Sequence, residues 1–327
     1  MSYLNRFIFF VLIFGWGCIM NGFASNADYV VSNYPEGIVV PGLIFDKPFD
    51  KDKFRVLYHH RNKSLDRLSI VISLQNLSLK EEIVYVRAGI GGPTEDMVFA
   101  GHKAAQAFLA QYLEQPKAIT LPALSSTFVL SHLIKPDQTS SGIVQLERNH
   151  HNQLLRVKMG VVDKKHPHLS FFRDISSPVN QYKVAHFTDS IREKTVFFDS
   201  KDTIMSVEVG GKPFLVDSHL NYELVGNYGV IHTFNFMLSN SLNAVKQFDF
   251  YLVPKKDNAV DRAVFLIDGR LIEVGVSFEK DDMISMQKFY SVLLNKKEKK
   301  KISMITLPQS GCYYPVDVMI RVMEGSL

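Results

Sequence analysis

The sequence predicts a mostly β protein, built from two Ig-like β-sandwich domains in tandem, the first with an inserted α-helix. Three observations indicate this class. Short runs of aromatic and β-branched residues alternate with polar residues along most of the chain, as they do in strands with one buried face. Polar turn residues separate these runs at hairpin spacing. With 327 residues, of which 46% are hydrophobic and 21% charged, the chain is long enough for two cores.

The first predicted sandwich covers residues 28–163. In FRVLYHHRN (54–62), Phe54, Val56 and Tyr58 share one face, and the polar residues between them share the other. RLSIVISLQN (67–76) and EEIVYVRAG (81–89) continue the pattern as a hairpin. A helix is predicted over 97–115 because its apolar residues recur at helical spacing. Further strand-like runs follow it.

The second predicted sandwich covers residues 200–327 and repeats the same order of patterns. LSIVISLQN followed by IVYVRAG matches TFNFMLSN followed by FDFYLVP, with Asn76 against Asn240 at the strand ends. This match favours two related domains, joined by a linker over 164–199 that mixes prolines and charge. A stretch at 281–297 fits a second helix, or equally a strand entered by a loop.

The N-terminus is typical of a secretory signal peptide over residues 1–27. One positive charge precedes the apolar run FIFFVLIFGWGCIM, and small residues follow at Ala24, Ser25 and Ala27. Cleavage is expected after Ala27, with Ala24 as the alternative. An uncleaved anchor and a lipoprotein modified at Cys18 fit less well, since the apolar run is shorter than the roughly 20 residues that span a bilayer. The mature chain is therefore expected in the periplasm or outside the cell.

Charge and cysteine content limit the function classes. The formal net charge of +4 is mild and does not favour nucleic acid as a partner. Loss of the signal peptide would leave Cys312 as the single cysteine, which excludes an internal disulfide, a multi-cysteine zinc site and an iron–sulfur cluster. No cofactor is predicted, and the membrane is expected to be contacted only by the signal peptide.

The glycine-rich stretch at 89–93 resembles a nucleotide-binding loop but lacks what that loop needs. Pro93 stands where a third glycine belongs, and no Gly-Lys-Ser/Thr follows. We therefore predict a turn, with Thr94 as the N-cap of the helix and Glu95 and Asp96 in its first turn. No nucleotide partner is expected.

Histidines are the strongest candidates for a functional site. Neighbouring strand residues point to opposite faces, so His59 and His60 are not expected to share a metal ion. His102, next to Gly101 in the predicted helix, is the histidine best placed for a specific role, such as lining a cleft. No metal site is predicted, and His59, His60 and His102 are retained as possible binding residues.

Two further features near the C-terminus concern binding and catalysis. Tyr313 and Tyr314 are adjacent aromatics and could form a platform that stacks on a sugar, although strand period favours core packing. Cys312 could form a dyad with a distant histidine, but a buried small residue explains it better. No catalytic residue is predicted.

Three segments carry a resemblance to a known group. RVLYHHRN, VRAGIGGPTEDMVFAGHKAAQAFL and TLPQSGCYYPVDVMIRV together resemble a group of uncharacterised exported bacterial proteins. In that group a VGH-like element follows a glycine–proline turn, and a YPV-like motif lies near the C-terminus. The resemblance covers most of the mature chain. It implies two β-sandwich domains and an exported location, and it implies no activity.

These patterns predict an exported, non-enzymatic binding or structural protein of the bacterial cell envelope that acts through protein or glycan contacts. The alternative is a hydrolase or metal-dependent enzyme with a His-containing cleft between the domains. An enzyme predicts that His102, His59 or His60 converge with an acid in a pocket, whereas a binding module predicts an exposed aromatic or apolar patch and scattered histidines.

Overall fold

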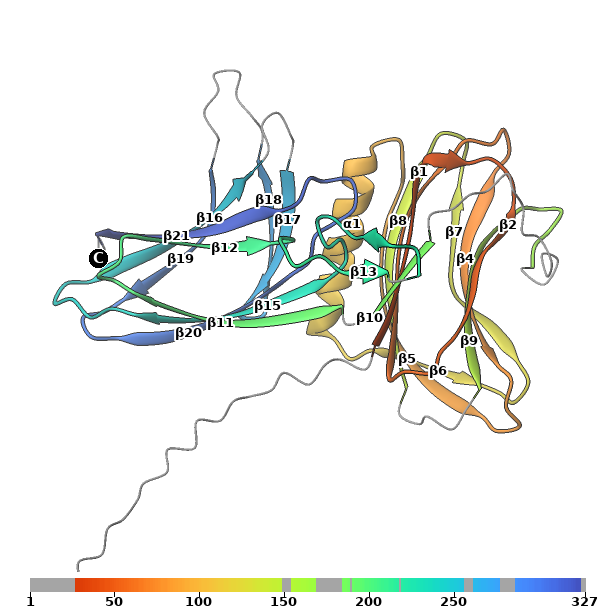
Figure 1. The fold of residues 1–327 in the computed structure, drawn as a ribbon, viewed down its shortest axis with the longest axis horizontal. Helices are drawn as coiled ribbons and strands as arrows, with labels where there is room; N and C mark the ends of the chain where they lie inside the picture. Colours follow the sequence, from red (N-terminus) through yellow and green to blue (C-terminus); the bar gives the residue numbers. More distant parts are fainter. Residues whose placement is uncertain are drawn as a thin grey trace, which may run out of the picture.

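Two β-sandwiches lie side by side with a single helix between them in the computed structural model, which describes residues 27–148, 154–168, 184–188, 190–217, 219–255, 261–276 and 286–324 (Figure 1). The strands of the second sandwich run toward the helix, while those of the first run alongside it. The predicted fold class, two tandem sandwiches with a helix inserted in the first, is confirmed. The predicted signal peptide lies outside the described residues.

The first sandwich consists of a six-stranded sheet in the order β10-β1-β3-β8-β5-β6 and a four-stranded sheet in the order β2-β9-β4-β7. All neighbours are antiparallel except β1 and β3, which are parallel. The strands are β1 (Ala27–Ile38), β2 (Gly42–Pro48), β3 (Lys53–Asn62), β4 (Leu68–Asn76), β5 (Glu82–Thr94), β6 (Lys117–Leu121), β7 (Ser126–Ile134), β8 (Thr139–Arg148), β9 (Leu155–Val162) and β10 (Val184–Thr188).

The second sandwich consists of a five-stranded sheet in the order β11-β15-β20-β17-β18 and a four-stranded sheet in the order β12-β21-β16-β19. A two-stranded hairpin of β13 and β14 lies against β10 of the first sandwich. The strands are β11 (Ile191–Asp199), β12 (Ile204–Val209), β13 (Val216–Asp217), β14 (Tyr222–Glu223), β15 (Ile231–Ser239), β16 (Lys246–Pro254), β17 (Asp261–Ile267), β18 (Arg270–Val276), β19 (Gln287–Leu294), β20 (Lys299–Thr306) and β21 (Val316–Glu324).

Both sandwiches share one topology. If β10, β13 and β14 are set aside, the order 1-3-8-5-6 of the first large sheet becomes 11-15-20-17-18, and the order 2-9-4-7 becomes 12-21-16-19. In both, the first strand pairs in parallel with the third. The repeat expected from the sequence is therefore present.

The register of that repeat differs from the expected one. Asn240 follows β15, whose counterpart is β3, so Asn240 corresponds to Asn62 and not to Asn76. The Nδ2 of Asn62 donates to Ile134 O at the end of β7, at 3.1 Å, and that of Asn240 to Leu294 O at the end of β19, also at 3.1 Å. Asn76 builds a similar corner one strand later. The sequence match was one strand out because the same corner occurs twice in the first sandwich.

Several local expectations also change. The segment 164–199, predicted as a linker, contributes β10 to the first sandwich and β11 to the second, and the domain limits themselves stay a prediction. Alternation is hard to see in β11 because its first half, Arg192–Thr195, is polar. The ambiguous stretch at 281–297 contains β19 in its described part and no helix.

Helix α1 (Met97–Ala110) ends earlier than predicted and continues as one 3₁₀ turn over Gln111–Leu113. Its N-cap is Asp96, not Thr94: the Asp96 carboxylate accepts a hydrogen bond from the Phe99 amide at 2.9 Å. The glycines before it are not a turn but the end of β5, which runs on to Thr94. No described helix is long and apolar enough to cross a membrane.

The glycines of β5 let α1 lie directly on the strand. A Cβ on Gly91 would lie 1.9 Å from the Ala100 carbonyl oxygen, and one on Gly89 would lie 2.2 Å from that of Ala104. Side chains at these positions would hold the helix away from the sheet. The glycine-rich stretch thus sets a close helix–strand contact.

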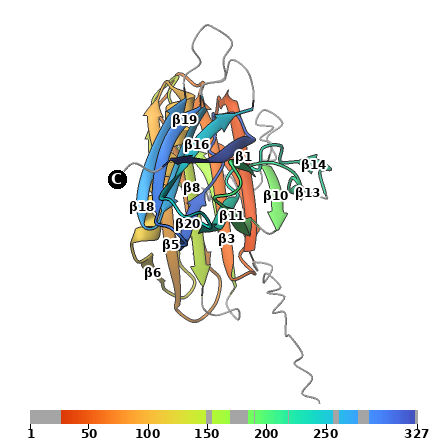
Figure 2. The same cartoon turned by 90° about the vertical axis from the view of Figure 1, so that its left-hand side faces the viewer.

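An apolar core joins the two sandwiches, in addition to the core inside each. In the view of Figure 2 the second sandwich lies in front of the first. It contains the inner face of α1 and the outer face of β1 and β3 from the first sandwich, together with residues of the second. The buried members from the first are Tyr29, Val31, Leu57, Ala105, Phe108, Leu109, Ile143, Ala185 and Phe187, and those from the second are Leu224, Val230, Ile231, Val264 and Leu307.

Candidate functional site

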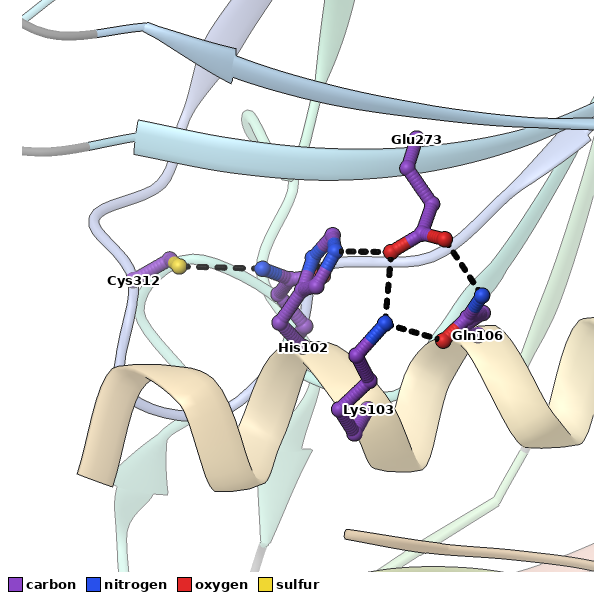
Figure 3. Close-up of polar contacts among 6 residues, drawn as sticks. His102, Lys103, Gln106, Glu273 and Cys312 are labelled. Carbon is purple, nitrogen blue, oxygen red and sulfur yellow. Dashed lines mark hydrogen bonds and ion pairs between the residues drawn. The ribbon is translucent and has the colours of Figure 1, made fainter. Parts of the chain in front are cut away.

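A cluster of polar side chains lies where α1 meets the second sandwich. His102 and Gln106 are one helical turn apart on α1 and therefore share a face, with Lys103 beside them. Glu273 of β18 faces them, and Gln309 and Cys312 come from the loop that connects β20 to β21. Figure 3 shows these six side chains, which we call the interdomain cluster.

Glu273 is the centre of the interdomain cluster. Its Oε2 lies 2.7 Å from His102 Nε2 and 3.0 Å from Lys103 Nζ, and its Oε1 accepts a hydrogen bond from Gln106 Nε2 (Figure 3). Lys103 Nζ also donates to Gln106 Oε1 at 2.7 Å. Three side chains of the first sandwich therefore hold one carboxylate of the second.

Electrostatics keep that carboxylate charged. Burial raises the pKa of Glu273, but the hydrogen bonds from Lys103 and His102, with the charge of Lys103, outweigh burial, so the pKa lies below its ordinary value. About 38% of the Glu273 side chain is exposed, whereas only 4% of His102 is. Solvent therefore reaches the interdomain cluster at Glu273, while His102 is shielded from it.

The backbone around His102 is as closely packed as its side chain. A Cβ on Gly101 would lie 1.7 Å from the Ser310 carbonyl oxygen, so only glycine allows α1 to touch the β20–β21 loop. In that loop Gly311 has a φ of +80°, and a Cβ there would lie 2.7 Å from Met97 O. The two sides of this contact, Gly101 and Ser310-Gly311, lie in two of the segments that carry the sequence resemblance.

Cys312 and His102 do not form a direct pair. Gln309 lies between them: its Nε2 donates to Cys312 Sγ at 3.0 Å, and its Oε1 lies 3.3 Å from His102 Nδ1. Cys312 is buried and not disulfide-bonded. A thiol–imidazole dyad needs contact between the two reacting groups, and here an amide separates them.

His59 and His60 lie on opposite faces of β3, as strand alternation predicts. His60 faces the core of the first sandwich, where its Nε2 lies 2.9 Å from Ser32 Oγ and its ring stacks beside that of Tyr58. His59 is buried on the outer face, its Nδ1 has no hydrogen-bond partner, and burial lowers its pKa to about 4. Among the described residues, neither histidine is paired with His102 or with an acid.

Tyr313 and Tyr314 also point apart. Tyr313 is 51% exposed, while Tyr314 is buried, with its hydroxyl 3.3 Å from Arg262 O and its ring edge-on to Tyr228. They do not present a shared aromatic face. Within the described ranges, no three His, Cys, Asp or Glu side chains are grouped so as to hold a metal ion.

No sequence pattern indicates that Arg55 lies between the sandwiches. This guanidinium is 2% exposed, and it donates to Gln145 Oε1 at 2.6 Å, to Ser190 O at 2.9 Å and to Gly229 O at 3.3 Å. Tyr29 likewise donates its hydroxyl proton to Tyr228 O. These bonds join residues 90 to 199 positions apart in the sequence, so local pattern carries no signal of them.

No protein-family model and no curated protein matches the chain, so the resemblance to the exported bacterial group stays a prediction. Among solved structures, the CUB1-EGF-CUB2 domains of rat MASP-1 align with 9% identity over 90% of this chain and 99% of that chain, at a TM-score of 0.19. The CBM22-1–CBM22-2 tandem domain of Paenibacillus barcinonensis Xyn10C aligns with 8% identity over 88% and 92%, at 0.18. The ANXUR2 extracellular domain of Arabidopsis thaliana aligns with 9% identity over 92% and 97%, also at 0.18. Likenesses this weak carry no argument about function.

Proposed function

We propose that this chain is an exported binding or structural protein of the bacterial cell envelope, acting through protein or glycan contacts and not through catalysis. The observation that carries the proposal is the use made of His102. Both ring nitrogens lie against partners, Glu273 and Gln309, in a buried contact that joins the two sandwiches. An enzyme would need these side chains to be open to a substrate, whereas here they hold the two sandwiches together.

The first sandwich offers a surface suited to such contacts. A groove of about 610 Å³ lies on the outer face of the sheet β2-β9-β4-β7. Its apolar lining includes Phe128, 43% exposed, and Leu133, 50% exposed, and its charged lining includes Arg67, Lys164 and Lys165. Exposed apolar side chains with a polar rim are typical of binding surfaces.

Retention on envelope material tests the proposal. We expect the purified chain to sediment with insoluble cell-wall glycan or, with a photo-crosslinking residue in place of the groove residue Ser131, to be trapped on an envelope protein. The double variant Phe128→Ser/Leu133→Ser should reduce retention or crosslinking about tenfold, the effect expected when a central apolar contact is lost. The control Leu79→Ser/Leu220→Ser removes two exposed leucines elsewhere and should leave both readouts unchanged. If the chain without the serine substitutions shows no retention and no crosslink, the proposal is refuted.

A further inference from the structure

The second sandwich has an open mouth where the edges of its two sheets part. β11 is the edge of the five-stranded sheet and β12 the edge of the four-stranded sheet. In the first sandwich β10 covers the outer edge of the equivalent strand β1, whereas no described strand pairs with the outer edge of β11. A cavity of about 520 Å³ lies in this mouth, lined by Arg192, Glu193, Lys194, Glu208, Gly211, Lys212, Pro213, His232, Thr233 and Phe234.

Three cations line this mouth. Arg192 and Lys194 are paired in register with His232 and Phe234, whose side chains face inward, so both cations project between the two sheets. Arg192 donates to the carbonyls of Gly211, at 3.2 Å, and Pro213, which fixes its guanidinium across the opening. Within the described chain, no ion pair neutralises Lys194 or Lys212.

The two acids of the mouth are already engaged. Glu208 forms an ion pair with Lys255, and their hydrogen bond raises the pKa of Lys255. Glu193 Oε1 accepts a hydrogen bond from Asn235 Nδ2 at 2.8 Å. Lys255 is shared between Glu208 and Asp317, and the neutral Asn235 amide leaves Glu193 charged. The four cations therefore exceed the three carboxylates by one, and this net positive charge attracts an anion.

His232 supplies an independent sign of a missing partner. Its side chain lines the cavity and is 5% exposed, and its Nε2 is buried without a hydrogen-bond partner. Burial first, and then the charge of Arg192, lowers its pKa to about 4, so the ring is neutral near pH 7. A buried polar atom left unpaired is costly and rare in native proteins, and a ligand hydroxyl would satisfy it.

We infer that this mouth binds an acidic sugar, with Arg192, Lys194 and Lys212 holding the carboxylate and His232 bonding a hydroxyl group. The lining favours a sugar over a peptide because only Pro213 and the buried Phe234 are apolar side chains among it. A sugar hydroxyl can pair with His232 Nε2 in either tautomer of the neutral ring, whereas a bare anion can only accept a hydrogen bond. The site shares no residue with the groove of the first sandwich, so either proposal can fail alone.

Calorimetric titration of the full chain at low salt tests the inference, with trigalacturonate, a neutral galactose trisaccharide and inorganic phosphate as probes. We expect trigalacturonate to bind more tightly than both other probes. Lys194→Gln/Lys212→Gln should weaken it more than about tenfold, because charged hydrogen bonds to the carboxylate are lost. The control Lys300→Gln/Lys301→Gln removes the same charge from exposed β20 positions and should change binding less than about twofold.

His232→Leu separates a binding role from a structural one. Removing an unpaired buried nitrogen should not lower the thermal midpoint of the free chain, yet it should weaken trigalacturonate binding while leaving the weak phosphate binding unchanged. Absence of trigalacturonate binding, equal affinity for phosphate or for the neutral trisaccharide, or equal loss in the β20 control would each overturn the inference.

Discussion

His59 and His232 show how one residue type takes its chemistry from burial. Both imidazoles are buried, and in both burial lowers the pKa to about 4. In the unfolded chain the pKa of each would be near 6.5. The stabilisation from keeping the rings neutral is therefore complete above pH 6.5 and is lost as the pH falls from 6.5 toward 4, where the unfolded chain binds protons that the folded chain does not.

We predict that the free energy of unfolding falls between pH 7 and pH 5, and that His59→Met makes this fall shallower. One histidine shifted this far contributes up to roughly 3 kcal/mol across its whole titration range. Urea unfolding at pH 7, 6 and 5 measures the slope. His219→Gln, at an exposed histidine, is the control and should keep the original slope; an unchanged slope in His59→Met would contradict the prediction.

The sequence alone predicted part of the surroundings of these histidines. Strand period correctly placed His59 and His60 on opposite faces of β3, because alternation is a local property of the backbone. It could not predict that the outer face would be buried too, since the residues that cover His59's face lie far along the chain. The same holds for Glu273, which only the fold brings to His102.

At the scale of elements, the contact between β5 and α1 depends on residues without side chains. Gly89 and Gly91 were expected to form a turn, since glycine, proline and a following helix are typical of one. They lie instead in a strand, because the helix carbonyls occupy the space that a Cβ would need. A single sequence does not distinguish a glycine that allows close packing from a glycine that allows a turn.

Gly91→Ala should therefore lower the free energy of unfolding by roughly 1–3 kcal/mol, the usual cost of overpacking. Gly275→Ala is the matched control in β18, where a Cβ would meet nothing nearer than Arg262 Cγ at 4.0 Å, and it should change stability by less than about 0.5 kcal/mol. Denaturant unfolding compares the two. Equal stability of the two variants would show that α1 does not press on β5.

The asparagine corners show a second limit at this scale. Asn62, Asn76 and Asn240 each end a strand and hold the carbonyl that ends another strand. Their recurrence correctly indicated a repeat. Because the corner is used twice in the first sandwich, the sequence alone could not show which copy matches Asn240, and only sheet order resolves it.

For the whole molecule, the interface between the sandwiches combines an apolar core, the buried Arg55 and the interdomain cluster. Gly101 is its tightest point. We predict that Gly101→Ala displaces the β20–β21 loop from α1 and weakens the contact between the two sandwiches. Calorimetry should then resolve two unfolding transitions, and small-angle scattering should show a larger radius of gyration.

Ala107→Ser, a small change on the same helix at a partly exposed position, is the control and should keep one transition and the original radius. A single transition and an unchanged radius in Gly101→Ala would mean that the loop shifts without releasing the sandwich. The prediction concerns the joint alone, because Gly101 belongs to neither proposed binding surface.

The position of α1 in the chain also fixes an order of events during synthesis. The helix and the outer face of β3 are complete long before β17, β18 and the β20–β21 loop leave the ribosome. Until then the nascent chain presents Tyr29, Leu57 and Phe108 without their cover. If the chain folds in the order of synthesis, the first sandwich exposes an apolar, aggregation-prone surface until the second sandwich forms. A chaperone that binds apolar surfaces would protect the chain most during that interval.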